Sequence, residues 1–214
     1  MPDPLDLSRV EVGDMRPDER DDAVAVVARA MSTSPMARAV IRAEPEVCRR
    51  HLTRMFTRLY MTAHTQRPLV ARLDGRVIAS TNDLVAGACR FGARERLAAL
   101  PDVIVTPPAI TVRTLRWLAA WEQRDPDRPH SHYGPFGVEP ELQGRGVGSL
   151  VMTEYTRRLD AAGEDAYLET DKPENVALYS RYGFQVTEEA DVLGTPNWFM
   201  WRDAGADAPA TRAR

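Results

Sequence analysis

The chain has 214 residues, of which 43% are hydrophobic and 28% charged, and its formal net charge is −3. These values are typical of one folded domain with a substantial core, and the lack of excess positive charge argues against nucleic acid and anionic membranes as partners. Two cysteines, Cys48 and Cys89, are too few for a disulfide framework or a cysteine-ligated metal site. Because the sequence shows neither an export signal nor an apolar run of about 20 residues, we expect a cytoplasmic location.

The first half of the chain alternates between strand and helix patterns. In chain order we expect a strand over 9–15, a helix over 20–31 that breaks at 32–35, an amphipathic helix over 52–63, strands over 69–73 and 76–80, and helices over 94–100 and 111–123. The two strands form a β-hairpin, because Asp74-Gly75 supplies the positive φ values of a tight turn.

The second half indicates more strands and two further helices. We expect strands over 130–138, 166–169, 184–192 and 197–201, a helix over 147–162 that ends at Gly163, and a short helix around Asn175 and Tyr179. Residues after Asp203 offer no apolar anchor, which predicts a disordered tail over 204–214 behind a single domain over 1–203.

A glycine-rich segment stands between the strand at 130–138 and the helix at 147–162. Its residues are Gln143, Gly144, Arg145, Gly146, Val147 and Gly148. Unpaired N–H groups at a helix N-terminus attract anions, and glycine lets a diphosphate approach the backbone. The dinucleotide fingerprint would need a glycine where Ser149 stands, and a nucleotide-hydrolase loop needs a Gly-Lys pair, whereas the only lysine is Lys172.

Two motifs in the correct order resemble the GNAT superfamily of acyl-CoA-dependent N-acetyltransferases. The first runs from Val138 through Gln143-Gly-Arg-Gly-Val-Gly to Ser149, and the second is Asn175-Val-Ala-Leu-Tyr179 with Tyr182-Gly-Phe after it. The resemblance implies an α/β (α+β) fold with a mixed, bent central sheet, splayed parallel strands and flanking helices. It also implies acetyl-CoA as acyl donor, bound by Phe136, Gly137, Val138, Gln143, Gly144, Arg145, Gly146, Val147, Gly148, Ser149, Asn175 and Tyr179.

The chain is also similar to the puromycin N-acetyltransferase-like group of that superfamily. The similarity rests on helices inserted before the cofactor strand, on Leu168-Glu-Thr, and on a closing strand that contains Pro196-Asn-Trp198-Phe-Met200. It is loosest in the first 130 residues or so, where such enzymes recognise their acceptors, and therefore transfers no substrate.

Pro135 and Gly137 interrupt a strand that is otherwise apolar. Proline removes a hydrogen-bond donor and glycine weakens packing, so we expect a β-bulge here. In the superfamily that this chain resembles, such a break splays two parallel strands, and the backbone of Phe136 and Val138 would then bind the pantetheine arm. The alternative is a purely structural bulge.

Asn175 and Tyr179 are one helical turn apart and share a face. The resemblance implies that Asn175 binds a pantetheine amide and that Tyr179 protonates the departing thiolate. A tyrosine, with an ordinary pKa near 10, remains protonated at neutral pH and suits that role. The alternative is that Tyr179 is only a core aromatic residue.

An amine must lose a proton before it attacks a thioester, so a general base or a water chain is needed. Glu169 is the first candidate, because it ends the strand beside the cofactor strand. A carboxylate there could instead bind the cationic acceptor. His130 and His132, which alternate onto one face of the cofactor strand, are rival bases. Two histidines without a recognised third ligand are weak evidence for a metal site.

We therefore expect direct acetyl transfer in a ternary complex, from acetyl-CoA to a primary amine of a small molecule. No cysteine lies in the cofactor motifs to carry the acyl group. The alternatives are a protein lysine or N-terminal acetyltransferase and a non-catalytic acyl-CoA-binding regulator. Trp117 and Trp121, one turn apart, wall an acceptor pocket or pack in the core. A homodimer is left open.

Overall fold

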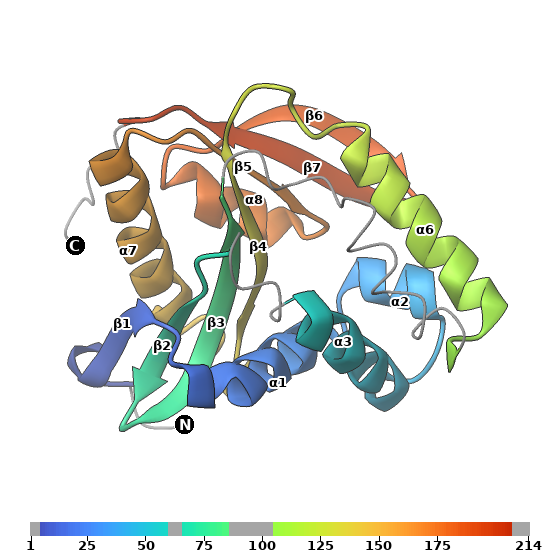
Figure 1. The fold of residues 1–214 in the computed structure, drawn as a ribbon, viewed down its shortest axis with the longest axis horizontal. Coiled ribbons are helices and arrows are strands. Elements are labelled where there is room, and N and C mark those ends of the chain that lie inside the picture. Colours follow the sequence, from blue (N-terminus) through green and yellow to red (C-terminus); the bar gives the residue numbers. More distant parts are fainter. Residues whose placement is uncertain (1–4, 60–65, 86–104, 207–214) are drawn as a thin grey trace.

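The computed structural model describes residues 5–59, 66–85 and 105–206, which form a mixed sheet flanked by helices (Figure 1). The strands are β1 (Val10–Asp14), β2 (Leu69–Leu73), β3 (Arg76–Leu84), β4 (Ser131–Val138), β5 (Ala166–Thr170), β6 (Gln185–Val192) and β7 (Thr195–Arg202). The helices are α1 (Arg20–Met31), α2 (Pro35–Ile41), α3 (Pro45–Leu59), α6 (Pro108–Glu122), α7 (Val147–Ala162) and α8 (Pro173–Ser180). The predicted fold class is confirmed.

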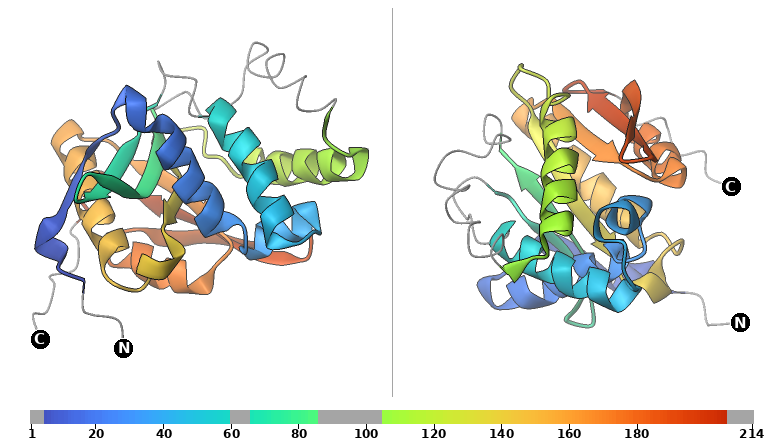
Figure 2. Two further views of the ribbon diagram at one scale, coloured as in Figure 1. Left: turned by 90° about the horizontal axis from the view of Figure 1, so that it is seen from below. Right: turned by 90° about the vertical axis from the view of Figure 1, so that its right-hand side faces the viewer.

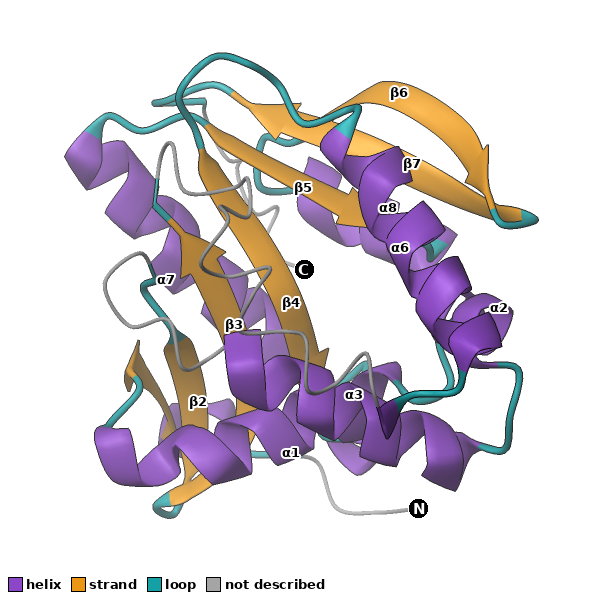
Figure 3. Cartoon of the chain, turned by 45° about the vertical axis from the view of Figure 1, so that its right-hand side comes forward, coloured by secondary structure: helices purple, strands orange, loops and turns teal. Residues whose placement is uncertain are grey.

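The sheet has the order β1-β2-β3-β4-β5-β7-β6, and its only parallel neighbours among the described residues are β4 and β5. Their ladder contains two residue pairs, Ser131 with Ala166 and His132 with Tyr167. Beyond His132 the two strands continue without pairing and separate, as Figure 3 shows. The predicted splay between two central parallel strands is therefore present.

Helices cover both faces of the sheet. Helices α1, α2, α3 and α6 lie over one face, which we call the α1 face, and α7 and α8 lie over the other, the α7 face (Figures 1 and 3). On the α1 face, α1 lies beside α3 and α6 packs on α2 (Figure 2). Side chains alternate between the faces along a strand, so Tyr167 enters the α1-face core and Leu168 the α7-face core.

Local sequence signals explain most element boundaries. Asp74 and Gly75 both have positive φ, 51° and 79°, which confirms the predicted hairpin turn. The break at 32–35 is real, but it also begins α2, a helix that the sequence reasoning missed. Ser34 caps α2 by accepting a hydrogen bond from the Ala37 N–H, and Pro35 occupies the first helical position.

The two tryptophans expected at an acceptor pocket or in the core lie in the core, and several other predicted features fall outside the described residues. Trp117 is 6% exposed and meets Trp121 edge-on in the α1-face core, so packing explains both tryptophans. The expected helix at 94–100, Cys89 and residues 207–214 lie outside the described residues. Within the described residues, no helix combines the length and apolar character needed to cross a membrane.

Candidate active site

Strand β4 contains the expected bulge. Thr81 of β3 pairs with Phe136 and Asp83 with Tyr133, so β4 has one residue more than β3 over the same stretch. The extra residue falls at Gly134-Pro135, which are joined by a cis peptide bond. The bulge places Tyr133 and Phe136 on the same, α7 face of the sheet, where their rings lie 5.7 Å apart.

The backbone of β4 after the bulge points toward the gap beside β5. The Glu139 N–H donates to the Ile78 carbonyl at 2.9 Å, and the register continues with Gly137 opposite Ser80. Hydrogen-bonded and non-hydrogen-bonded pairs alternate in an antiparallel ladder, so Phe136 and Val138 direct their N–H and C=O groups away from β3. This is the orientation that binding of a pantetheine arm would need.

Gly137 lets α1 approach β4 closely. A Cβ atom at this position would lie 2.8 Å from the Val27 Cα and 2.9 Å from the Ala30 Cβ. The expectation assigned Gly137 to cofactor binding, whereas the contacts that require a glycine here are with the helix on the α1 face. The glycine therefore lets α1 pack closely against β4 beside the splay.

The glycine-rich segment forms the N-terminus of α7 as predicted. Gly146 is the N-cap with φ 92°, and Gly144 has φ 71°, conformations that favour glycine. The Gln143 amide donates to the Val138 carbonyl at 3.0 Å and ties this loop to the end of β4. Gly148 faces the Phe136 ring, which a Cβ atom would contact at 3.5 Å.

The first turn of α7 buries the Val147 side chain and presents backbone N–H groups at the helix N-terminus. Val147 is fully buried, so it can reach a ligand only through its backbone. Helix-initiating N–H groups have no partner within the helix, and here they lie beside the end of β4. The Ser149 carbonyl accepts from the Tyr182 hydroxyl at 2.9 Å, which braces this turn against the end of α8. Arg145 is half-buried.

Asn175 and Tyr179 lie on α8, over the α7 face. The Asn175 amide donates to the Thr170 hydroxyl at 3.2 Å, at the end of β5. The Tyr179 side chain is 4% exposed, and its ring meets Tyr133 edge-on at 6.0 Å. Burial, and to a lesser extent the charge of Asp171, raises the pKa of Tyr179, which keeps the hydroxyl protonated.

Glu169 and His132 form a pair across the point where β4 and β5 separate. His132 is the last β4 residue paired with β5, and its Nε2 lies 2.8 Å from the Glu169 Oε2. The Glu169 side chain is 2% exposed, and within the described residues its Oε1 has no hydrogen-bond partner. A buried, half-satisfied carboxylate at this place is a candidate for binding or deprotonating an amine.

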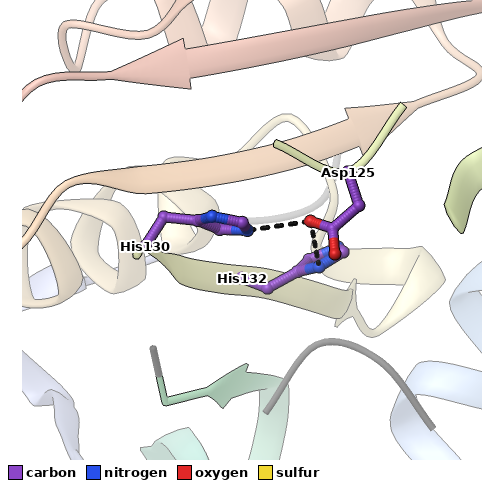
Figure 4. Close-up of side chains that lie close together, drawn as sticks. All are labelled: Asp125, His130 and His132. Atoms are coloured by element: carbon purple, nitrogen blue, oxygen red, sulfur yellow. Dashed lines mark ion pairs between the residues drawn. The ribbon is translucent and has the colours of Figure 1, made fainter. Parts of the chain in front are cut away.

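Asp125 joins the two histidines, and sequence reasoning missed it. It follows α6 in the chain, and Figure 4 shows its carboxylate between the two rings. Its Oδ1 lies 2.9 Å from the His130 Nε2 and 4.0 Å from the His132 Nδ1. Asp125 lies only five residues before His130 in the chain, and the fold turns its carboxylate toward both rings.

The two groups of candidate residues lie on opposite faces of the sheet. The rings of His130 and His132 contact Tyr167 at 5.4 and 5.3 Å, and Tyr167 belongs to the α1-face core. Tyr179 belongs to the α7-face core. The gap between β4 and β5 is where a molecule held on the α7 face can meet one held on the α1 face.

Comparison with known proteins identifies the class of enzyme. The sequence profile of the acetyltransferase (GNAT) family matches residues 36–184, more than half of the chain. The chain belongs to this family, so it is an acyltransferase that uses acetyl-CoA as its acyl donor.

Solved structures with the same fold cover nearly the whole chain. An acetyltransferase of Corynebacterium glutamicum, described as histone acetyltransferase HPA2 and related acetyltransferase, has a TM-score of 0.66 and 19% identity over 94% of this chain and 99% of its own. Agmatine N-acetyltransferase has a TM-score of 0.60 and 16% identity over 91% and 99%. A GNAT acetyltransferase of Brucella melitensis in complex with acetyl-CoA has a TM-score of 0.52 and 18% identity over 94% and 91%.

A curated protein matches a short part of the chain. Peramine synthetase ppzA of Metarhizium majus is 41% identical over 59 residues, which are 26% of this chain. The matched part covers 2% of that protein's own length.

Proposed function

We propose that the chain transfers the acetyl group of acetyl-CoA directly to a primary amine of a small molecule. The observation that carries this proposal is Glu169, a carboxylate with 2% exposure that His132 holds at 2.8 Å. It stands on the α1 face at the start of the gap between β4 and β5. A carboxylate attracts an ammonium group and can then accept its proton.

The cofactor would occupy the α7 face and the gap. The diphosphate would bind at the first N–H groups of α7, and the pantetheine arm would bind the outward-facing backbone of Phe136 and Val138. Asn175 would hold the arm from α8. Tyr179, whose raised pKa keeps it protonated, would donate its proton to the thiolate as the C–S bond breaks.

The acceptor would approach from the α1 face. Four of the described helices cover this face, and the Glu169 side chain is 2% exposed. Such cover suits a small amine better than a folded protein surface, because a bulky acceptor would have to displace helices. The name of agmatine N-acetyltransferase, a protein with the same fold, gives a small amine as acceptor and supports this proposal. The motifs at 168–170 and 196–200 support placement in the puromycin N-acetyltransferase-like group.

Direct transfer is favoured over an acyl-enzyme. Cys48 is fully buried on α3, where its thiol donates to the Ala43 carbonyl at 3.3 Å, and Cys89 lies outside the described residues. Initial rates with both substrates varied should therefore give intersecting rather than parallel double-reciprocal lines.

The proposal is tested by thiol release from acetyl-CoA with a panel of amines. The panel contains small primary amines, a lysine peptide and a peptide with a free N-terminus. We expect turnover with a small amine. Turnover only with peptides would replace the small-molecule acceptor by a protein, and no turnover with any amine would contradict the proposed function.

Glu169→Gln then distinguishes a base from an anchor. Loss of the base should lower kcat by roughly 100-fold or more, whereas loss of an anchor for the ammonium group should mainly raise KM. Glu189→Gln, at an exposed position of β6, is the matched control. An unchanged kcat and KM in Glu169→Gln would remove Glu169 from the mechanism.

A further inference from the structure

Asp125, His130 and His132 bring three metal-binding atoms together under the end of α6. Their ligand atoms all lie within 4.8 Å of one another, with separations of 2.9 and 4.0 Å from the Asp125 Oδ1 to the two ring nitrogens. Ligands of a tetrahedral zinc ion, bound at 2.0–2.2 Å, are about 3.4 Å apart. The two separations lie on either side of that value. From this geometry we propose that the three side chains bind one divalent transition-metal ion.

In each histidine, the ring nitrogen that does not face Asp125 has a hydrogen-bond partner, as is usual for histidines that bind a metal ion. The His130 Nδ1 lies 2.8 Å from the Arg128 carbonyl, and the His132 Nε2 lies 2.8 Å from Glu169. Because both partners only accept hydrogen bonds, each of these nitrogens carries a proton. In metal sites, a ligating histidine usually donates its second ring N–H to a carboxylate or a backbone carbonyl. The remaining nitrogens, His130 Nε2 and His132 Nδ1, are the ones that face Asp125.

Asp125 is placed for an ion rather than for a hydrogen bond. Its side chain is 6% exposed, and its Oδ1 lies within hydrogen-bonding distance of the His130 Nε2. Yet this buried oxygen accepts no well-aligned hydrogen bond from any described residue. Two atoms that bind the same metal ion lie close together without a hydrogen bond between them, because each points at the ion and not at the other atom. Without a bound ion, burial of this carboxylate would cost free energy, because it gives up its contacts with water and gains no aligned hydrogen bond in exchange.

The charge of the cluster also fits a divalent cation. Asp125 and Glu169 are two buried carboxylates with 6% and 2% exposure, and neutral imidazoles would leave both uncompensated. One divalent ion bound to Asp125 and the two histidines balances the cluster. Two imidazole nitrogens and one carboxylate oxygen favour zinc over magnesium or calcium, which prefer oxygen ligands. The His132 side chain, 18% exposed, leaves room for a water molecule as fourth ligand.

A bound ion would fix the position of Glu169 without being needed for cofactor binding. It would orient the His132 ring, so that its Nε2–H donates to Glu169 in one geometry. Metal binding by these three side chains requires neither the acceptor nor acetyl transfer.

The test is titration of tag-free, chelator-treated protein with Co²⁺ and Zn²⁺. We expect one Co²⁺ ion per chain with the visible absorption of four-coordinate cobalt, and we expect Zn²⁺ to displace it. Zn²⁺ should also raise the melting temperature, because it binds only the folded chain. If the wild type shows no saturable binding of either ion, the metal site does not exist.

Three variants locate the ion. Asp125→Ala should abolish the cobalt spectrum, and Glu169→Gln, which changes only the partner of a ligand, should weaken Zn²⁺ binding by about 10–100-fold. His51→Gln, on α3, is the matched control and should bind as the wild type does. An unchanged spectrum in Asp125→Ala would place the ion elsewhere and overturn the proposal. If that variant does not fold, the wild-type titration and Glu169→Gln still decide.

Discussion

At the scale of single residues, Tyr179 is a buried tyrosine on α8 that belongs to the α7-face core. Burial raises its pKa. In the proposed mechanism the hydroxyl is therefore protonated near neutral pH and available to protonate the departing thiolate, after which solvent or the proton released by the amine restores it.

We expect Tyr179→Phe to lower turnover by about 100-fold or more, with little change in acetyl-CoA affinity or melting temperature. Phenylalanine keeps the ring contacts with Tyr133 and Phe184 and removes only the hydroxyl. Rates should be measured below the pKa of the thiol, roughly 8.5, because a thiolate leaves unaided above it. Full turnover under saturating acceptor would make Tyr179 a packing residue.

Glu19 provides a pH-dependent contribution to stability. It is 4% exposed and accepts two hydrogen bonds of 2.6 Å from Arg72, which link the start of α1 to β2. The Arg72 guanidinium holds the pKa of Glu19 at about 2, although burial alone would raise it. A carboxyl group with a lowered pKa stabilises the fold above its unfolded pKa, near 4.3, and loses that effect as the pH falls toward 2.

Glu19→Gln should therefore reduce the free energy of unfolding by roughly 3 kcal/mol at pH 7, since each pKa unit corresponds to about 1.4 kcal/mol. The difference from wild type should shrink between pH 5 and pH 2. Urea unfolding at several pH values measures it, with the exposed Asp18→Asn as control. A difference that is the same at pH 7 and pH 2.5 would contradict this assignment.

At the scale of elements, the contact between α1 and β4 depends on one missing side chain. Gly137→Ala would place a methyl group 2.8 Å from the α1 backbone at Val27, and a helix backbone cannot yield as a flexible side chain can. We expect a loss of stability of about 1–3 kcal/mol in urea unfolding. Gly13→Ala on β1 is the control, because its Cβ would meet only the Arg72 side chain at 3.7 Å. Equal stability of the two variants would show that α1 moves freely on β4.

The end of β7 is anchored by residues that the sequence assigns to a tail. Arg202, buried at 1% exposure, donates to the Ala206 carbonyl at 2.8 Å. The Ala204 N–H donates to the Asp165 carboxylate at 2.8 Å, in the turn between α7 and β5. Residues 204–206 therefore close one end of the sheet, at the start of the segment expected to be disordered.

Two truncations separate this anchor from the rest of the tail. A chain ending at Ala206 should melt as the full chain does. A chain ending at Asp203 should lose about 1–3 kcal/mol, because the buried Arg202 then keeps its bonds to Tyr182 and Asp160 but loses the one to the Ala206 carbonyl. Calorimetry of both truncated chains and of the full chain measures the melting temperatures that test this prediction. Equal melting temperatures, or a large loss on removing 207–214, would contradict this role of residues 204–206.

At the scale of the whole molecule, the sequence predicts the helices, turns and bulges that depend on residues close together in the chain. The helix at α7, the hairpin turn at Asp74-Gly75 and the bulge near Pro135 all follow from local backbone chemistry. Helix α2 had a readable signal in Ser34-Pro35, which was interpreted only as a break. Asp125 had a weaker one. It lies five residues before His130, but nothing in this short loop shows from the sequence that its carboxylate turns toward the two rings.

The two-pair ladder between β4 and β5 has a consequence for how the molecule unfolds. Strands β1 to β4 come from the first 138 residues and β5 to β7 from the last 49, and along the sheet only two residue pairs join these halves. Backbone hydrogen bonds therefore transmit little cooperativity from one half to the other. An extended molecule with amide groups, lying between β4 and β5, would restore the missing ladder from both edges. Acetyl-CoA would then act as a temporary strand, so that the two halves unfold as one unit when it is bound and more independently when it has left.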